Sequence, residues 1–167
     1  MIVVETKRTC IKQIEQNDLE ALYSICGNNE LMKFVGDSKP LSIEQTQKWI
    51  DVSISNYKSK GFGMYGVFFK DNNQFIGYCG LVHSEDVNDN ELIYALMKEY
   101  WGLGLATELA DAIIKYGFET LKLKTIYASI DPANTASEKV LLKSGFKEVF
   151  KQNDEFGMET SYFLIQY

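Results

Sequence analysis

The sequence predicts a single α+β domain, and three observations support this. Runs rich in β-branched and aromatic residues alternate with polar turns in the middle of the chain, as in an antiparallel meander. Amphipathic segments with apolar residues at helical spacing lie before and after this block. The 167 residues are 46% hydrophobic, enough for one sizeable core, and no repeat, low-complexity tract or linker divides them.

The first sixty residues predict one strand and two helices. Partial alternation of apolar and polar residues favours a strand over residues 2 to 14. A helix over about 18 to 27 follows, between a residue that can cap it and a glycine. Ser42 and Gln45 form a capping-box pattern, which predicts a second helix over 43 to 59.

Three strands follow in the middle of the chain. The runs 63 to 70 and 74 to 83 are joined by Asp71-Asn72-Asn73, a strong hairpin signal. Residues 84 to 90 make a polar turn before the strand 91 to 97. This block therefore predicts an antiparallel meander.

The last third of the chain alternates helices and strands. Apolar residues at helical spacing predict a helix over 104 to 120, and a β-rich run predicts a strand over 125 to 130. A helix over about 135 to 144 comes next and is stopped by a glycine. Two last strands are expected near 146 to 152 and 158 to 166.

Charge and cysteine content exclude several classes of protein. A formal net charge of −6 and a sequence pI near 4.9 argue against nucleic acid as a partner and suit a cationic substrate better. Cys10, Cys26 and Cys79 form no C-x-x-C pair, and one histidine cannot complete a metal set, so no metal is expected. No signal-peptide core or membrane-spanning run is present, so we expect a cytoplasmic protein without a membrane partner, either monomer or homodimer.

Two glycines and a small residue stand where the strand 91 to 97 gives way to a helix. The first amides of a helix have no intrahelical acceptor and favour negative charge, and glycine lets an anion approach closely. Gly102, Gly104 and Ala106 can therefore hold a phosphate chain. The segment fits neither a Walker loop nor a dinucleotide fingerprint, because it lacks their Lys-Ser and acidic residues. A tight turn without a ligand is the alternative.

A second motif lies downstream of this turn. Asn134-Thr135-Ala136-Ser137 is followed after seven residues by Gly145-Phe146. Together with Trp101 to Ala106, which match a Trp-Gly-x-Gly-x-Ala pattern, these residues make the chain resemble the Gcn5-related N-acetyltransferase (GNAT) superfamily. The resemblance is to its branch of ribosomal-protein N-terminal acetyltransferases and extends over residues 5 to 166.

The resemblance implies a GNAT-like fold and acetyl-CoA as co-substrate. The expected sheet is mixed but mostly antiparallel, with about 6–7 strands and about four flanking helices. It splays between the strands 91 to 97 and 124 to 131, and acetyl-CoA enters the gap. The pantetheine arm would run beside the first of these strands, and amides of the glycine turn would hold the pyrophosphate. The implied binding residues are Ile93, Ala95, Leu96, Met97, Trp101, Gly102, Leu103, Gly104, Leu105, Ala106, Thr107, Asn134 and Ser137.

The resemblance also implies two catalytic residues. Glu91, at the start of its strand, could draw a proton from the acceptor ammonium directly or through water, and Ser137 could protonate the departing thiolate. Many superfamily members use a tyrosine as this acid, where the chain has Leu141. Each residue also has a structural alternative: Glu91 as a solvated strand-end carboxylate, and Ser137 as a helix residue bonding only the backbone.

The expected reaction is acetyl transfer from acetyl-CoA to a primary amine by direct attack, because no cysteine lies in a nucleophile motif. A protein or peptide N-terminal α-amine is the favoured acceptor, because its pKa near 7.7 to 8.0 leaves about a tenth of it neutral at pH 7. A polyamine, amino acid or antibiotic is the alternative acceptor. A non-catalytic CoA-binding sensor module is a further alternative. The acceptor pocket is expected between residues 28 to 60 and the turn 84 to 90.

Overall fold

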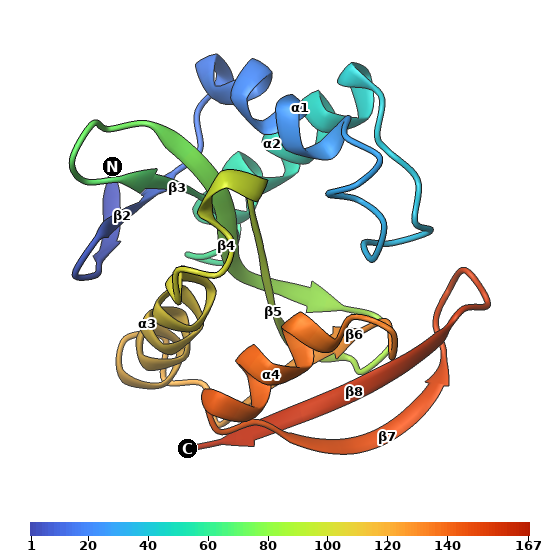
Figure 1. Ribbon diagram of the computed structural model, residues 1–167. Helices are drawn as coiled ribbons and strands as arrows, with labels where there is room; N and C mark the ends of the chain where they lie inside the picture. The colour runs from blue at the N-terminus through green and yellow to red at the C-terminus, as the bar shows by residue number, and fades with distance from the viewer.

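The computed structural model describes all 167 residues and consists of one eight-stranded sheet with two helices on each face (Figure 1). The strands are β1 Ile2–Glu5, β2 Thr9–Gln13, β3 Met64–Phe69, β4 Phe75–Ser84, β5 Asp89–Leu96, β6 Thr125–Ile130, β7 Lys147–Asn153 and β8 Glu159–Gln166. The helices are α1 Leu19–Cys26, α2 Ile43–Ser59, α3 Leu105–Glu119 and α4 Thr135–Lys143, with 3-10 turns at Gln16–Asp18 and Lys98–Tyr100.

The strand order is β1-β2-β3-β4-β5-β6-β8-β7, and every neighbouring pair is antiparallel except β5 and β6. The prediction of a single strand over residues 2 to 14 was wrong, because the segment folds into the hairpin β1–β2. Its turn is closed by Thr6, whose amide donates to the Thr9 carbonyl at 2.9 Å and whose hydroxyl accepts from the Thr9 amide at 2.9 Å. This hairpin raises the number of strands from the expected 6–7 to eight.

Two other boundaries differ from the sequence prediction. Residues Asp89 and Asn90 belong to β5 rather than to the preceding turn, so Glu91 is the third residue of its strand and not the first. They pair with Ser84 and His83 of β4, which extends the β4–β5 hairpin. The predicted α2 was confirmed from end to end, with the capping box of Ser42 and Gln45 in place.

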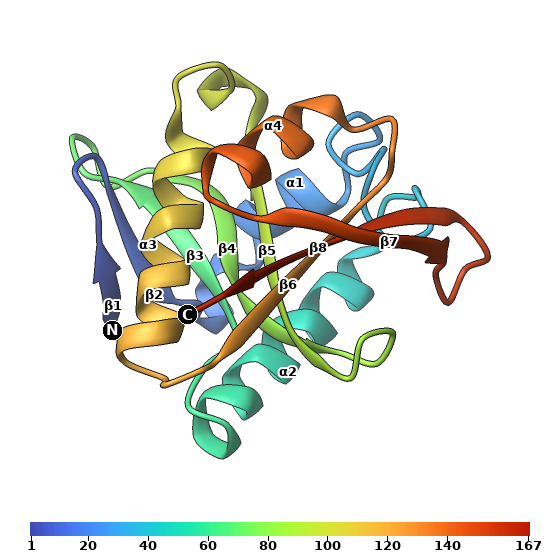
Figure 2. The same ribbon diagram turned by 90° about the horizontal axis from the view of Figure 1, so that it is seen from below.

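Each face of the sheet carries its own core. The larger core lies under α3 and α4 and includes Leu109, Ile113 and Leu141, all fully buried. The smaller core lies under α1 and α2 and includes Leu22 and Ile50. The two helix pairs are seen on opposite sides of the sheet in both views (Figures 1 and 2). None of the helices is long and apolar enough to cross a bilayer.

The sheet opens between β5 and β6. These parallel strands pair at a single position, Glu91 with Tyr127, and their carboxyl ends diverge beyond it. The splay expected between these segments is therefore present, and it leaves one edge of β5 without a neighbouring strand.

Candidate functional site

A cavity of about 420 Å³ lies at this opening. Its wall contains Glu91 and Ile93 of β5, and Asn134 and Ser137 at the start of α4. The loop 28 to 41 adds Phe34, which lies within the range 28 to 60 that was expected to border the acceptor pocket. The cavity therefore brings both expected catalytic residues together with part of the expected acetyl-CoA site.

The backbone of β5 presents alternate residues to the opening. The Met97 amide donates to the Ile76 carbonyl of β4 at 2.8 Å, so the main chains of Met97, Ala95 and Ile93 face β4. By the same alternation the main chains of Tyr94 and Leu96 face the opening. The expected added-strand contacts to pantetheine would therefore come from these two residues, whereas Ile93 and Ala95 offer only side chains.

The carbonyl of Leu96 shows where this edge ends. It accepts a hydrogen bond from the indole Nε1 of Trp101 at 2.8 Å. Trp101 is otherwise half exposed, so its ring holds the chain between β5 and α3 rather than filling a core. This contact fixes the glycine turn to the end of the open edge.

The glycine turn offers a series of free amide donors. The backbone amides from Gly102 to Thr107 make no hydrogen bond, and the first bond of α3 runs from the Glu108 amide to the Gly104 carbonyl. Gly102 and Gly104 have φ angles of +73° and +74°, in the left-handed region that favours glycine. The N-terminus of a fifteen-residue helix adds its dipole. The turn therefore has the donors of an anion site.

Arg8 supports this turn from the β1–β2 hairpin, and the sequence analysis missed it. Its Nη1 donates to the Leu103 carbonyl at 2.8 Å, and its Nε and Nη2 lie 2.8 Å from Glu108 Oε2. A Cβ placed at Gly104 would lie 3.8 Å from Arg8 Nη2, so the guanidinium adjoins the anion site. No local pattern indicates a contact across 100 residues, because only the folded sheet creates it.

Glu108 is held in its charged form. Burial alone would raise the pKa of Glu108, but hydrogen bonds from Thr6 and Arg8, together with the Arg8 charge, leave that pKa below its ordinary value. The carboxylate therefore keeps Arg8 in place at neutral pH.

The start of α4 forms the opposite side of the opening. Asn134 is the N-cap of α4, and its Oδ1 accepts from the Ser137 amide at 3.2 Å. This bond orients the first turn and leaves the Ser137 hydroxyl without a hydrogen-bond partner in the protein. Leu141, in the same wall, is fully buried and brings no polar group.

Tyr94 brings a second hydroxyl to this point. Its Oη donates to the Ser137 carbonyl at 3.4 Å. Burial raises the pKa of Tyr94 to about 12, against a smaller opposing effect of the bond to Ser137, so the phenol stays protonated at neutral pH. The sequence did not single out Tyr94, because only the folded chain brings it against α4.

Glu91 lies in the wall with no partner for its carboxylate. The residue is nine-tenths buried and makes neither a hydrogen bond nor an ion pair through its side chain. Its neighbour across the ladder is Val82 of β4, on the face of α1 and α2. A buried carboxylate without a protein partner is an expected feature of a proton acceptor or a cation site.

The single histidine, a lysine near the glycine turn and the three cysteines have other partners or lie outside the cavity wall. His83 is exposed at the rim, 3.7 Å from Glu85. Lys98 is 2.7 Å from Glu30 in an exposed pair, and none of the cysteines lines the cavity. Burial raises the pKa of the Cys26 thiol to about 12, which keeps it unreactive.

Residues 8 to 147 match the family model described as Acetyltransferase (GNAT) domain, which is most of the chain. The chain belongs to the GNAT acetyltransferases. The uncharacterized N-acetyltransferase YoaA of Bacillus subtilis is 31% identical over 147 residues, which cover 87% of this chain and 83% of that protein. The comparison supports the same N-acetyltransferase class.

Solved GNAT structures share the fold over nearly the whole chain. A GNAT-family acetyltransferase from Bacillus anthracis superposes with a TM-score of 0.83 at 22% identity, covering 99% of this chain and 98% of that one. RimL, a ribosomal L7/L12 alpha-N-protein acetyltransferase in complex with coenzyme A, superposes with a TM-score of 0.84 at 15% identity, covering 99% of this chain and 98% of that one. At such identities these two structures show the fold alone.

GNAT enzymes use acetyl-CoA, and the residues described above fit it chemically. The six free amides from Gly102 to Thr107 suit a pyrophosphate, and a Cβ at Gly102 would enter open space, so an anion has room there. The open main-chain groups of Tyr94 and the amide of Leu96, whose carbonyl is already bonded to Trp101, suit the amide groups of a pantetheine arm. Five residues of strand, about 17 Å, separate Glu91 from Leu96 and so join the cavity to the glycine turn.

Proposed function

We propose that this N-acetyltransferase acts on a primary amine by direct attack, with a protein or peptide N-terminal α-amine as the preferred acceptor. The main support for this proposal is that Glu91 and Ser137 line the same cavity, at the opening between β5 and β6. An acceptor bound at Glu91 would meet a donor lying along the open edge. The acetyl group would pass directly from acetyl-CoA to the acceptor, so no residue of the chain would have to carry it covalently.

Glu91 would accept the proton that the acceptor ammonium must lose before its nitrogen can attack. The attack forms the carbon–nitrogen bond of the amide and breaks the carbon–sulfur bond of the thioester. An outward-facing β5 amide, from Tyr94 or Leu96, would donate to the thioester oxygen as negative charge develops on it. The Ser137 hydroxyl, or the nearby Tyr94 phenol, would give a proton to the departing sulfur, and the second proton that the nitrogen loses as the amide forms would restore that hydroxyl.

The pKa of the acceptor supports an α-amine. With a single carboxylate as base, an amine near pKa 7.7 to 8.0 is about a tenth neutral at pH 7, whereas a lysine-like amine near 10.4 is neutral about once in a few thousand. The first acceptor therefore costs less free energy to deprotonate. Faster acetylation of a lysine side chain than of any peptide N-terminus at neutral pH would overturn this preference.

Two measurements test the proposal together. Calorimetry measures the affinity for acetyl-CoA, and release of free thiol with a panel of peptides, amino acids, polyamines and aminoglycosides measures turnover. We expect binding and thiol release with peptide acceptors. Binding without release for any acceptor would instead support a non-catalytic CoA-binding module, and release with small amines alone would support the small-molecule alternative.

A further inference from the structure

The wall of the cavity carries an uneven charge. Of its 27 residues, seven are Asp or Glu and none is Lys or Arg, although the whole chain has 17 basic residues against 23 acidic ones. Besides Glu91, the acidic residues are Glu85, Asp86, Asp131, Asp154, Glu155 and Glu159. The net charge of the chain therefore does not by itself account for the sign of this surface.

Some of these carboxylates have a structural role, because they accept hydrogen bonds from backbone amides. Asp131 accepts from the Ala133 amide at 2.8 Å, and Asp154 accepts from the Phe156 and Met158 amides at 2.9 and 3.0 Å. These two hold turns. Glu155 and Glu159, on the β7–β8 hairpin, make no hydrogen bond or ion pair and remain available to a ligand.

Glu91 is a buried carboxylate in the same cavity, and it is a separate indication that the cavity binds a cation. The residue is nine-tenths buried and lines the same cavity, and its carboxylate has no partner in the protein. Tyr162 lies nearby, and its hydroxyl donates to Asp86 Oδ2 at 3.3 Å. Burial raises the pKa of Tyr162 to about 12, and the charges of Asp86 and Glu91 contribute in the same direction. Asp86 and Glu91 therefore both place negative charge near Tyr162.

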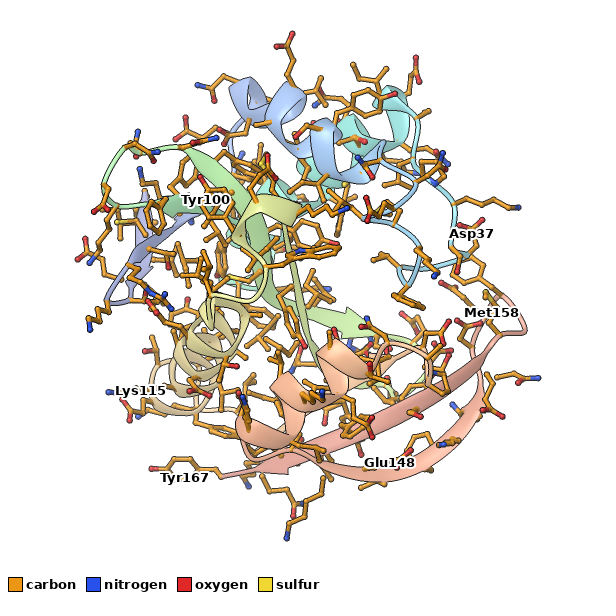
Figure 3. All side chains as sticks on the ribbon, viewed as in Figure 1. Asp37, Tyr100, Lys115, Glu148, Met158 and Tyr167 are labelled. Carbon is orange, nitrogen blue, oxygen red and sulfur yellow. The ribbon has the colours of Figure 1, made fainter.

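The loop 28 to 41 and the β7–β8 hairpin approach each other at the outer end of the cavity. Figure 3 shows Asp37 of the loop and Met158 of the hairpin on facing sides. A Cβ placed at Gly36 would lie 3.9 Å from the Phe156 ring. Phe34 and Phe156, both in the wall, add apolar surface to the same cavity as the carboxylates. A ligand with two positively charged groups joined by a methylene chain suits a cavity wall that combines carboxylates with apolar side chains.

We propose that the acceptor carries a second positive charge, which Asp86, Glu155 and Glu159 bind while the reacting amine lies at Glu91. This inference rests on the proposed function and names the substrate class of that site: a primary amine joined by a short aliphatic chain to a second cationic group. A peptide with lysine next to its N-terminus and a small aliphatic diamine both have this chemistry. Carboxylates at the rim steer and select such cations and reject acceptors with a nearby acidic group.

Matched acceptor pairs test the proposal and separate the two sources. One pair is a glycyl-lysyl peptide against the same peptide with norleucine, and the other is 1,4-diaminobutane against butylamine. We expect kcat/KM to be about tenfold higher for the cationic member of at least one pair, and the pair that responds identifies the source. Because the reacting group is an α-amine in both peptides, the peptide comparison changes little besides the second charge.

Charge-neutralising variants locate the effect. The double variant Glu155→Gln/Glu159→Gln should reduce the preference for the cationic member to less than about threefold. The control Glu20→Gln/Glu119→Gln removes the same total charge outside the cavity wall and should keep the preference. An equal loss in both double variants would assign the preference to the overall field and overturn the subsite.

The failures of the two proposals are distinguishable. No thiol release with any amine would contradict the acetyl-transfer proposal itself. Thiol release at equal kcat/KM for the charged and neutral members of both pairs would leave acetyl transfer standing and overturn the second-charge subsite.

Discussion

Arg8 gives the sharpest test of how the glycine turn is held. Its guanidinium joins the β1–β2 hairpin to the turn through the Leu103 carbonyl and to α3 through Glu108. The substitution Arg8→Gln removes these contacts and leaves Glu108 without its cation. We therefore expect losses both in stability and in acetyl-CoA affinity.

The structure sets the size of the expected effects. Arg8 and Glu108 are 36% and 19% exposed, so solvent screens part of their attraction. A charged hydrogen bond with this exposure, plus the bond to the Leu103 carbonyl, predicts a loss of about 1–2 kcal/mol in the free energy of unfolding. The loss of positive charge and of turn support should raise the Kd for acetyl-CoA about five- to tenfold.

Denaturant unfolding and calorimetry with acetyl-CoA measure the two quantities. The matched control is Lys115→Gln, which removes one positive charge from an exposed pair with Glu119 on the same helix. It should change stability by less than about 0.5 kcal/mol and leave the Kd unchanged. A folded Arg8→Gln protein with wild-type affinity would refute the role assigned to Arg8.

The contribution of Glu108 also has a pH dependence of known sign. Its pKa is lowered in the folded protein from an ordinary value of 4.5, so its stabilisation is fully present above that value and is lost as pH falls through the folded pKa. The stability difference between the wild type and Glu108→Gln should therefore narrow as the pH falls below 4.5. A difference that stays constant down to pH 3 would contradict the lowered pKa.

Four further substitutions probe the glycine turn and the cavity. Gly104→Val, at a φ of +74°, should cost about 1–2 kcal/mol or more of stability and weaken acetyl-CoA binding at least about tenfold, measured by unfolding and calorimetry. Glu91→Gln should lower kcat about a hundredfold with an unchanged Kd for acetyl-CoA; an equal loss in both would make Glu91 a structural residue. Ser137→Ala should lower kcat about tenfold or more, and a loss confined to Tyr94→Phe in steady-state assays would make that phenol the proton donor instead.

Local signals explain what the sequence predicted well. The capping box of Ser42 and Gln45 lies next to the helix that it starts, and α2 has the predicted ends. The glycine turn was recognisable because its positive φ angles need glycine at Gly102 and Gly104. Such features depend on residues a few positions apart, which a single sequence displays.

Long-range features explain what the sequence did not predict. The β1–β2 turn is closed by hydrogen bonds of the Thr6 and Thr9 side chains. It contains no glycine or proline, the residues by which a turn is usually recognised in a sequence. Arg8 meets Glu108 only after β1, β2 and α3 have come together. The acidic wall likewise gathers residues of the β4–β5 and β7–β8 hairpins, which are about seventy positions apart in the sequence.

The pleat of β5 determines how donor and acceptor can meet. Leu92 and Leu96 belong to the core under α3 and α4, whereas Ile93 and Ala95 pack against the core under α1 and α2. Glu91 and Ile93 are two residues apart on β5, so their side chains point to the same face of the sheet. The proposed base therefore lies on the α1 and α2 face, whereas Tyr94 contacts Ser137 of α4 on the other face. An intact sheet would separate these groups. Because β5 and β6 pair only at Glu91 and Tyr127, the sheet opens next to the proposed base. In the proposed reaction the acceptor nitrogen would meet the thioester through this opening, without a carrier residue.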